Sequence, residues 1–508
     1  MTKHNRNIQN SNSTPLDFNE PLKLENHKKP ITRRDFLGQG LIAGAAAVMV
    51  PSIFSLASSK VKAAELPVTE EQCNIAVNVA TGKIPFICVD LSGGANIAGS
   101  NVLVGGAGGQ LDYLEADGYK KLGLPANMLP NLDGQTATMD SGGSGLLFHA
   151  DSALLKGIRD IATQTTLDNV NGAVICARSS NDTSDNPHNP MYGIYKAGAD
   201  GDLLSLVGSR SSDSGGRSVA PASMMDLSVR PSKISSGNDA RGLIDTGKLA
   251  NLLPIPADAV SVMNAIQRIS ALKLEKTTIE AQRQINLECR YLETQKAAAS
   301  STARTDINLD ANLISVFANR GFDIADYEKT AAISKLVING VAGAGTIQFG
   351  GYDYHNSTRT TGEERDRRAG QQIGAALEYA RLVGNKVMIY VFSDGSVASD
   401  GKLDETGKGI WKGDNSSTSA SLMLVYDPNG LPQIANNNSQ IGYFKTNGSI
   451  ETAASVISNN VEQLAESVVL NYMALHNDVG RFAEVLPMHG LGATVADLDS
   501  LIAFQPLV

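Results

Sequence analysis

The chain has 508 residues, of which 42% are hydrophobic and 5% aromatic, and it carries a formal net charge of −9 at neutral pH. This length suits one large α/β domain or two ordinary domains. The acidic balance argues against nucleic acid or anionic lipid as a partner, because every phosphate contact requires a cation. A single tryptophan, Trp411, cannot form the platform of exposed rings that a carbohydrate-binding module uses.

The first 63 residues have the organisation of an export signal. A polar, basic segment ends at Arg33 and Arg34, and no charged residue occurs between residues 36 and 59. Paired arginines before a weakly hydrophobic segment are typical of the twin-arginine route, and small or modest residues predict cleavage after Ala63. A permanent membrane anchor is the alternative, since 24 uncharged residues could span a bilayer, but three glycines and a proline make that helix poor.

A signal of this kind predicts where the protein acts. We expect the twin-arginine translocase as a partner during export, residues 64–508 in the periplasm or outside the cell, and no stable membrane anchor. Residues 1–63 carry nine Lys or Arg against four Asp or Glu, so their removal would take the net charge from −9 to about −14.

The four cysteines do not predict a structural metal site. No pair has the spacing of metal ligands. Cys88 and Cys176 lie in apolar runs and are expected to be buried thiols. Because a protein of this route folds before export, in a reducing compartment, we expect no disulfide framework.

Five short apolar runs predict buried strands. They are residues 84–89, 172–177, 346–349, 386–392 and 421–426. Helical patterns occur at residues 152–161, 363–383 and 452–475. Strands that alternate with helices indicate an α/β fold, in which a largely parallel sheet is covered by helices on both faces.

Two stretches differ from this pattern. Residues 200–245 are rich in Gly, Ser, Arg and Asp and are expected to form an extended loop region. In residues 258–296, apolar side chains recur at helical spacing among charged ones, which predicts one or two amphipathic helices. We therefore expect residues 64–508 to form one α/β domain with a helical insertion near residues 250–300.

Acidic and imidazole side chains lie next to the predicted strands, at the edge where open parallel sheets bind ligands. They are Asp90, His188, Asp353, His355 and Asp394 after strands, and Asp414 before the last strand. Asp353 and His355, two residues apart in an extended segment, would point to the same face. Carboxylate and imidazole together suit a divalent cation such as zinc, manganese or magnesium.

Each of these residues also has a structural interpretation. Asp394 could cap a following helix, as strand-end aspartates often do. His188, between two prolines, could be an ordinary loop histidine, and His149 is expected to cap or pack. The nearby hydroxyls of Ser92, Ser393 and Ser396 identify no nucleophile, because a hydroxyl in a turn is usually a cap.

Several segments match the motifs of one family. Residues 350–355, Gly-Gly-Tyr-Asp-Tyr-His, are similar to a Gly-Gly-Trp-Asp-Thr-His motif, and residues 391–395 resemble a Phe-Ser-Glu-Phe-Gly turn. Residues 187–189 and 147–149 resemble Ser-His-Phe and Leu-His-Pro segments. The chain thus resembles the exported family known as domain of unknown function fifteen-oh-one, of the alkaline-phosphatase-like (sulfatase-like) superfamily, over almost all of residues 64–508.

This resemblance implies an alkaline-phosphatase-like domain that hydrolyses phosphate or sulfate esters with bound metal ions. Asp353, His355 and Asp394 would be the metal ligands, supported by His188 and Asp414. The metal would be zinc, manganese, magnesium or calcium.

The chain also departs from the family pattern. Asn96 stands where the family usually has Asp, residues 396–397 replace an Arg, and residues 413–416 lack the histidine of a Thr-Asp-His-Gly motif. An Asn carbonyl is a poorer ligand for zinc than imidazole. These losses favour an alternative function, in which a non-catalytic periplasmic or surface protein keeps the fold and binds or assembles with a partner.

Overall fold

The structure is a computed structural model that describes residues 82–180, 186–243, 304–317, 324–352, 354, 359–413, 415–436 and 439–508. All of these belong to one structural unit, Val68–Val508. The predictions that lie outside the described residues are the export signal with Arg33, Arg34 and Ala63, the helical insertion near residues 250–300, and the ligands Asp353, His355 and Asp414.

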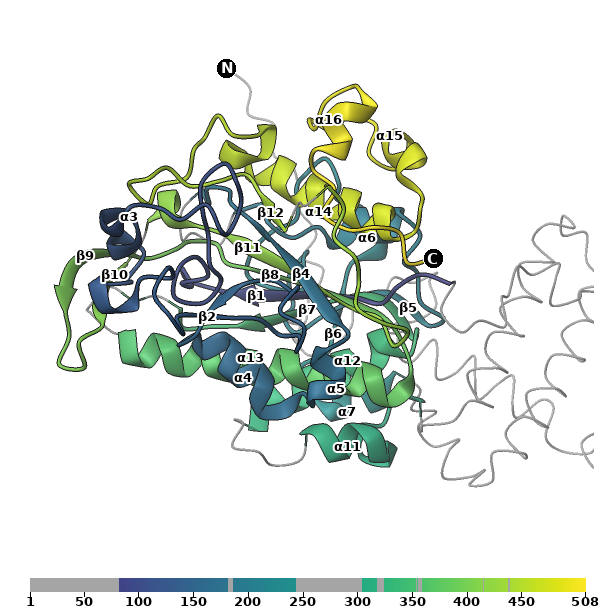
Figure 1. Cartoon of the computed structure of the whole chain (residues 1–508). Coiled ribbons are helices and arrows are strands. Elements are labelled where there is room, and N and C mark those ends of the chain that lie inside the picture. Colours follow the sequence, from purple (N-terminus) through teal and green to yellow (C-terminus); the bar gives the residue numbers. More distant parts are fainter. Residues whose placement is uncertain are drawn as a thin grey trace, which may run out of the picture. The chain divides into compact units, whose positions relative to one another are not determined.

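All five predicted strands are present in one sheet of eight described strands (Figure 1). In spatial order these are β12 (Gln440–Ile441), β4 (Val170–Ile175), β11 (Ser421–Tyr426), β8 (Val387–Phe392), β1 (Phe86–Leu91), β7 (Ala342–Phe349), β5 (Leu204–Gly208) and β6 (Ser232–Lys233). β11 is antiparallel to both of its neighbours, and every other neighbouring pair in the described sheet is parallel. The prediction of an α/β fold with a largely parallel sheet is confirmed.

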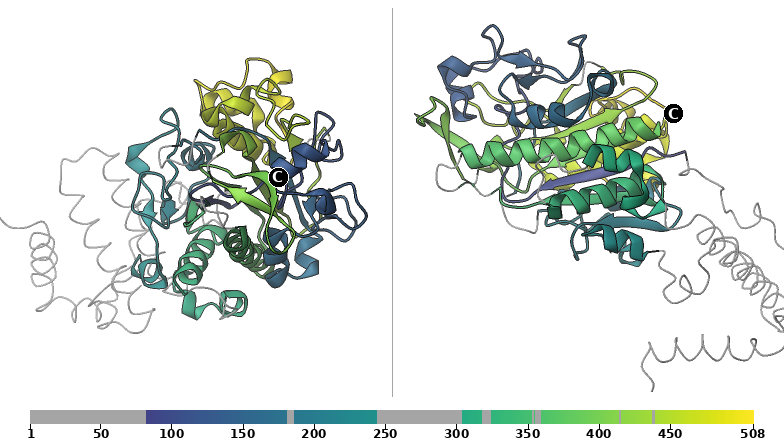
Figure 2. Two further views of the ribbon diagram at one scale, coloured as in Figure 1. Left: turned by 90° about the vertical axis from the view of Figure 1, so that its left-hand side faces the viewer. Right: turned by 90° about the horizontal axis from the view of Figure 1, so that it is seen from below.

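Helices cover both faces of this sheet (Figure 2). α4 (Ala153–Ile161), α12 (Ile324–Ile338) and α13 (Arg359–Val383) pack on one face, and α6 (Met191–Lys196) and α14 (Val461–Leu475) pack on the other. Strand β1 serves both cores, because Ile87 and Val89 enter the first and Phe86 and Cys88 enter the second. Cys88 and Cys176 are buried free thiols, as predicted.

Shorter elements complete the described part of the chain. The helices are α3 (Ala116–Lys121), α5 (Gln164–Leu167), α7 (Gly237–Gly242), α11 (Ala311–Phe317), α15 (Phe482–Val485) and α16 (Val495–Asp499). Strands β9 (Ala398–Leu403) and β10 (Gly409–Lys412) form a hairpin, and β2 (Thr136–Ala137) pairs with β3 (Phe148–His149). Within the described ranges, no helix has the length and apolar character needed to cross a bilayer.

Two predictions about secondary structure are wrong. Residues 200–245 are not one extended loop, because β5, β6 and α7 lie within them. The short apolar sequence of β5 buries Leu206 and Val207 beside β7, and the polar residues around it hid that signal. The helix predicted for residues 452–475 is α14, which begins not at residue 452 but at Val461, where the Asn460 side chain accepts the first free N–H groups.

Helices α4 and α13 cross so closely that their backbones touch. A Cβ placed on Gly370 of α13 would lie 3.1 Å from the Cα of Gly157 and would overlap the carbonyl oxygen of Leu154, both in α4. A Cβ on Gly374 would meet the carbonyl oxygen of Ile158 at 2.5 Å. Glycine at these positions is therefore a packing requirement, despite its poor helix propensity.

We expect replacement of Ser152 by alanine to lower the free energy of unfolding by about 1 to 2 kcal/mol. The buried Ser152 hydroxyl caps α4 by accepting the N–H of Leu155 (3.1 Å), and it donates to the side-chain oxygen of Asn101 (3.0 Å). Lys156→Ala is the control, because that half-exposed side chain pairs with Asp151 at the surface, and a change below about 0.5 kcal/mol is expected. Equal effects of the two substitutions in denaturant titrations would contradict the capping role.

Candidate functional site

Asp90 is the penultimate residue of β1, rather than a residue after the strand as predicted, and it anchors a loop that is distant in sequence. Its Oδ2 accepts the backbone N–H groups of Arg217 (2.7 Å) and Ser218 (3.0 Å), and its Oδ1 accepts the hydroxyls of Ser92 (3.1 Å) and Ser218 (3.4 Å). A Cβ on Gly216 would lie 2.7 Å from Oδ2, so glycine is needed for this approach. Burial raises the pKa of Asp90, and these hydrogen bonds oppose the rise.

Asp394 follows β8 and lies at the same edge of the sheet. Its Oδ1 accepts the N–H of Gly93 (2.6 Å), and its buried Oδ2 has no hydrogen-bond partner but lies 3.6 Å from Nε of Arg217. Burial, and next the neighbouring charge of Asp90, raise the pKa of Asp394 to about 7, although Gly93 and Arg217 act against the rise. The helix-capping interpretation of Asp394 is wrong, because β8 leads into the β9–β10 hairpin.

His188 lies beside the end of β8. Its ring is buried and stacks on Phe392, with the ring centroids 6.0 Å apart. Asn186, two residues earlier, donates its side-chain amide to the carbonyl of Asp394 (2.7 Å). Burial lowers the pKa of His188 to about 4, so the ring is neutral at physiological pH. Neither Nδ1 nor Nε2 of His188 has a hydrogen-bond partner.

The hydroxyls considered as nucleophiles all have structural partners. Ser393 accepts the N–H groups of Gly94 (3.2 Å) and Ala95 (2.8 Å) and donates to the carbonyl at the end of β1 (2.6 Å). Ser396 shares a hydrogen bond with the Thr418 hydroxyl (3.0 Å). The bonds of Ser393 hold the glycine-rich loop after β1 against the turn after β8, and that of Ser396 ties this turn to the segment before β11.

The described neighbours of Asp353 and Asp414 lie at this edge as well. Tyr352 donates its backbone N–H to the carbonyl of Ser92 (3.1 Å), and Asn415 donates to a carbonyl in the turn after β8 (2.8 Å). The segment before β11 reaches the carboxyl ends of the other strands because β11 runs in the opposite direction. The predicted roles of Asp353, His355 and Asp414 themselves stay predictions.

The donor atoms at this edge provide only part of a metal site. Within the ranges that the structure describes, no three His, Cys, Asp or Glu side chains are arranged to hold a metal ion. Asp394 and His188 nevertheless keep buried ligand atoms without hydrogen bonds, which is unusual enough to require an explanation. Both oxygens of Asp90 are already engaged by protein donors.

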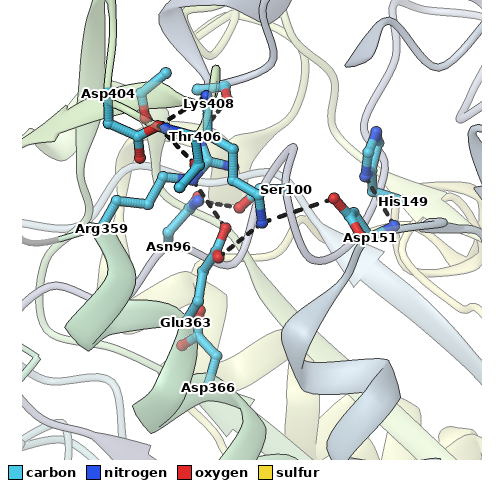
Figure 3. Close-up of polar contacts among 12 residues, drawn as sticks. Asn96, Ser100, His149, Asp151, Arg359, Glu363, Asp366, Asp404, Thr406 and Lys408 are labelled. Atoms are coloured by element: carbon cyan, nitrogen blue, oxygen red, sulfur yellow. Dashed lines mark hydrogen bonds and ion pairs between the residues drawn. The ribbon is translucent and has the colours of Figure 1, made fainter. Parts of the chain in front are cut away.

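Sequence reasoning missed Arg217 and a second polar cluster at the start of α13 (Figure 3). In that cluster the buried Arg359 donates to Glu363 (2.8 Å) and to carbonyls of the chain around it, and Lys408 of the β9–β10 hairpin lies 2.9 Å from Glu363 and 3.6 Å from Asp151. These contacts fasten the hairpin to α13. The spacing of Arg359 and Glu363, four residues apart in a helix, was the available signal.

The same cluster contains the buried Asp366 and also Asn96, which stands where the family described in the sequence analysis usually has an aspartate. The side-chain amide of Asn101 donates to Asp366 (2.8 Å) and to the carbonyl of Asn96 (2.6 Å). The Asn96 amide donates to the hydroxyl of Ser100. Burial raises the pKa of Asp366 to about 8, helped by the charge of Glu363.

The sequence also led to predictions about two aromatic side chains near this cluster, His149 and Trp411. His149 packs as expected, since it is buried, accepts the N–H of Asp151 at Nδ1 (3.1 Å) and contacts the carbonyl of Met128 through Nε2 (3.0 Å). Trp411 is not exposed for stacking on a ligand. It is buried in β10, where it packs on Tyr354 and lies 5.3 Å from the Arg359 guanidinium.

No family model matches this chain, and no curated protein sequence matches it either.

Proposed function

We propose that the chain is an exported, metal-dependent hydrolase of phosphate or sulfate esters, built on an alkaline-phosphatase-like α/β domain. The observation that carries the proposal is the pair of unsatisfied ligand atoms at the carboxyl edge of the sheet. Asp394 Oδ2 and the nitrogens of His188 are buried and without hydrogen bonds. Carboxylate oxygen and neutral imidazole are ligands that zinc and manganese accept, and neutral imidazole is the form that binds.

Asp394 and His188 would hold the metal, with Asp353, His355 and Asp414 as further ligands. A bound divalent ion would polarise the ester oxygen and lower the pKa of the attacking group. Asp90 would act through position, because it holds the backbone of Arg217 and so places the guanidinium beside Asp394. The Arg217 side chain is 41% exposed and could meet the anionic group of a substrate.

Export through the twin-arginine translocase, with Arg33 and Arg34 as the recognised pair and cleavage after Ala63, belongs to the same proposal. The place of action is then the periplasm or the extracellular space. The acidic balance of the chain fits a soluble exported domain whose partners are neither nucleic acids nor anionic membranes.

A second function, a non-catalytic binding or assembly protein, is favoured by one observation. The charge of Asp394 already has a cationic neighbour in Arg217, and Asp90 is fully hydrogen bonded by Ser92, Arg217 and Ser218. Because the Arg217 guanidinium can balance the charge of Asp394, the protein needs no metal ion at this site to remain folded.

Elemental analysis of the purified chain distinguishes the two functions. We expect about one or more equivalents of zinc, manganese or calcium in the wild type, and loss of that metal in a variant combining Asp394→Asn with His188→Gln. The matched control combines Asp133→Asn with His489→Gln, away from the site, and should keep the metal. Metal-loaded protein would then be screened with aryl phosphates and aryl sulfates.

The opposite result has a clear meaning. If the wild type holds no metal, and no divalent ion raises its thermal midpoint, the metal-dependent mechanism is wrong. A ligand present at 100 times its Kd should stabilise the native state by about 2.7 kcal/mol, which a thermal shift detects easily. The binding or assembly function would then be the working answer.

A further inference from the structure

Two cations at the carboxyl edge of the sheet have no acidic partner. Arg178 follows β4, and its guanidinium donates to the hydroxyl of Ser416 (2.9 Å) and to the side-chain oxygen of Asn459 (3.3 Å). Lys121 ends α3, and its ammonium donates to the hydroxyls of Ser417 (3.4 Å) and Ser449. In the part of the chain that the structure describes, no carboxylate lies within 4.0 Å of either cation.

Both cations are partly buried, which makes the missing counter-charge costly. The Nε of Arg178 is buried and has no hydrogen-bond partner. Burial alone lowers the pKa of Lys121, as expected for an ammonium with no carboxylate beside it. Elsewhere in the described ranges, buried or half-buried cations pair with acids, for example Lys335 with Asp310 at 2.6 Å and Arg359 with Glu363 at 2.8 Å.

Two further unsatisfied hydroxyls belong to residues that adjoin Arg178 along the chain or through a backbone hydrogen bond. Its neighbour Ser179 is 3% exposed, and Ser458 is fully buried, yet neither hydroxyl has a hydrogen-bond partner. Ser458 is adjacent, because its carbonyl accepts the backbone N–H of Arg178 (3.0 Å). Helix α14 starts three residues after Ser458, so the positive end of its dipole is on this side.

Two of the three serines that contact the cations are consecutive residues. Ser416 and Ser417 belong to a short 3-10 helix, Ser416–Thr418, that precedes β11. The preceding Asn415 donates its N–H to the carbonyl of Ser396, two residues after Asp394. The cations therefore flank a turn that is tied to the proposed hydrolytic site without being part of it.

We propose that Arg178 and Lys121 form a subsite for a phosphate or sulfate group carried by a larger molecule. This inference rests on the proposed function in one respect, since the bound group would be a second anionic group of the substrate. A guanidinium offers paired donors to a tetrahedral oxyanion, and an ammonium adds a point charge. The Nε–H of Arg178 is a further donor that lacks a hydrogen-bond partner.

The test is a calorimetric titration of the full-length chain with phenyl phosphate. A chelator is present throughout, so that no metal contributes to binding. We expect saturable binding, an increase in Kd of about tenfold for Arg178→Gln, and a smaller increase for Lys121→Gln. Arg178→Lys keeps the charge but not the paired donors and should lie between the wild type and Arg178→Gln. This conservative variant also guards against loss of folding.

Controls and contrary outcomes are defined by the same titration. Arg481→Gln and Lys402→Gln remove exposed cations that pair with acids, and both should bind as the wild type does. The inference fails if phenyl phosphate does not bind, if its Kd is unchanged in Arg178→Gln, or if inorganic phosphate binds and phenyl phosphate does not. If the protein binds phenyl phosphate in an Arg178-dependent way but takes up no metal in any condition, the hydrolase proposal is wrong and the subsite is supported.

Discussion

Replacing Gly370 by alanine is expected to lower the free energy of unfolding by about 3 kcal/mol or more, the upper end of overpacking effects. The added Cβ would overlap the carbonyl oxygen of Leu154 and lie 3.1 Å from the Cα of Gly157. These are backbone atoms, so no side chain can rotate away, and α4 and α13 would have to separate. Separation would open the core beneath both helices, where Leu155 and Ile373 are buried.

The same substitution at another helical glycine should change the free energy of unfolding in the opposite direction. Gly242 ends helix α7, and a Cβ there would meet nothing within 4 Å. Gly242→Ala should therefore raise stability by up to about 1 kcal/mol through helix propensity alone. Denaturant titrations followed by far-ultraviolet circular dichroism measure both variants. A Gly370→Ala protein as stable as Gly242→Ala would show that the close crossing of the two helices is not required.

The strands of the sheet could be predicted because strands buried on both faces consist of continuous apolar residues. Residues 386–392 and 421–426 match β8 and β11 within one residue. The direction of β11 could not be predicted, because an apolar run reads the same in both directions. Strand β5 was missed because its few apolar residues lie in a region dominated by Gly, Ser and Asp.

The candidate site was predictable only in part, for a physical reason. Asp394 and His188 were found because acidic and imidazole side chains near strand ends are a chemical signal that residue identity carries. Arg217 was not found, because its main link to the site is a backbone N–H that donates to Asp90, and any residue could provide that donor. The close approach itself was marked only by Gly216.

The polar cluster at α13 illustrates the same limit. Asn101 joins three segments, since its side chain bonds to Asp366, to Ser152 and to the carbonyl of Asn96. An asparagine in a glycine-rich loop looks like an ordinary turn residue in sequence. The burial of Asp366 was equally hidden, because the charged residues around it in α13 suggest an exposed surface.

The contribution of Asp366 to the free energy of unfolding should fall as pH rises, and Asp366→Asn should remove that contribution to the pH dependence. Asp366 is fully buried, with one hydrogen bond from Asn101 and the charge of Glu363 nearby (Figure 3). Its pKa is raised from 3.8 to about 8, so the native state holds a proton that the unfolded chain releases. The stabilising contribution is fully present below pH 4 and is lost progressively as pH rises to about 8.

One pKa unit corresponds to about 1.4 kcal/mol, so the full shift corresponds to at most about 6 kcal/mol. Asparagine has the shape of the neutral acid and never ionises. The variant should therefore match the wild type near pH 4 and exceed it increasingly up to pH 8. Urea titrations at pH 5, 7 and 9 test this, with Asp133→Asn as the control at an exposed position. Parallel stability curves for Asp366→Asn and the wild type would exclude a buried, protonated Asp366.

The position of Asp366 connects this pH dependence to the proposed site. The loop after β1 is held at one end by Asp394, which accepts the N–H of Gly93, and at the other end by Asn101, which donates to Asp366. Ionisation of Asp366 above about pH 8 would place a negative charge in the core. Among the described residues, no cation forms an ion pair with this carboxylate. Because the loop reaches Asp366 through Asn101, we expect alkaline pH to loosen the Asn101 end of the loop before the sheet unfolds. Amide hydrogen exchange of residues 92–101 should accelerate between pH 7 and 9, beyond the intrinsic rate increase, in the wild type but not in Asp366→Asn.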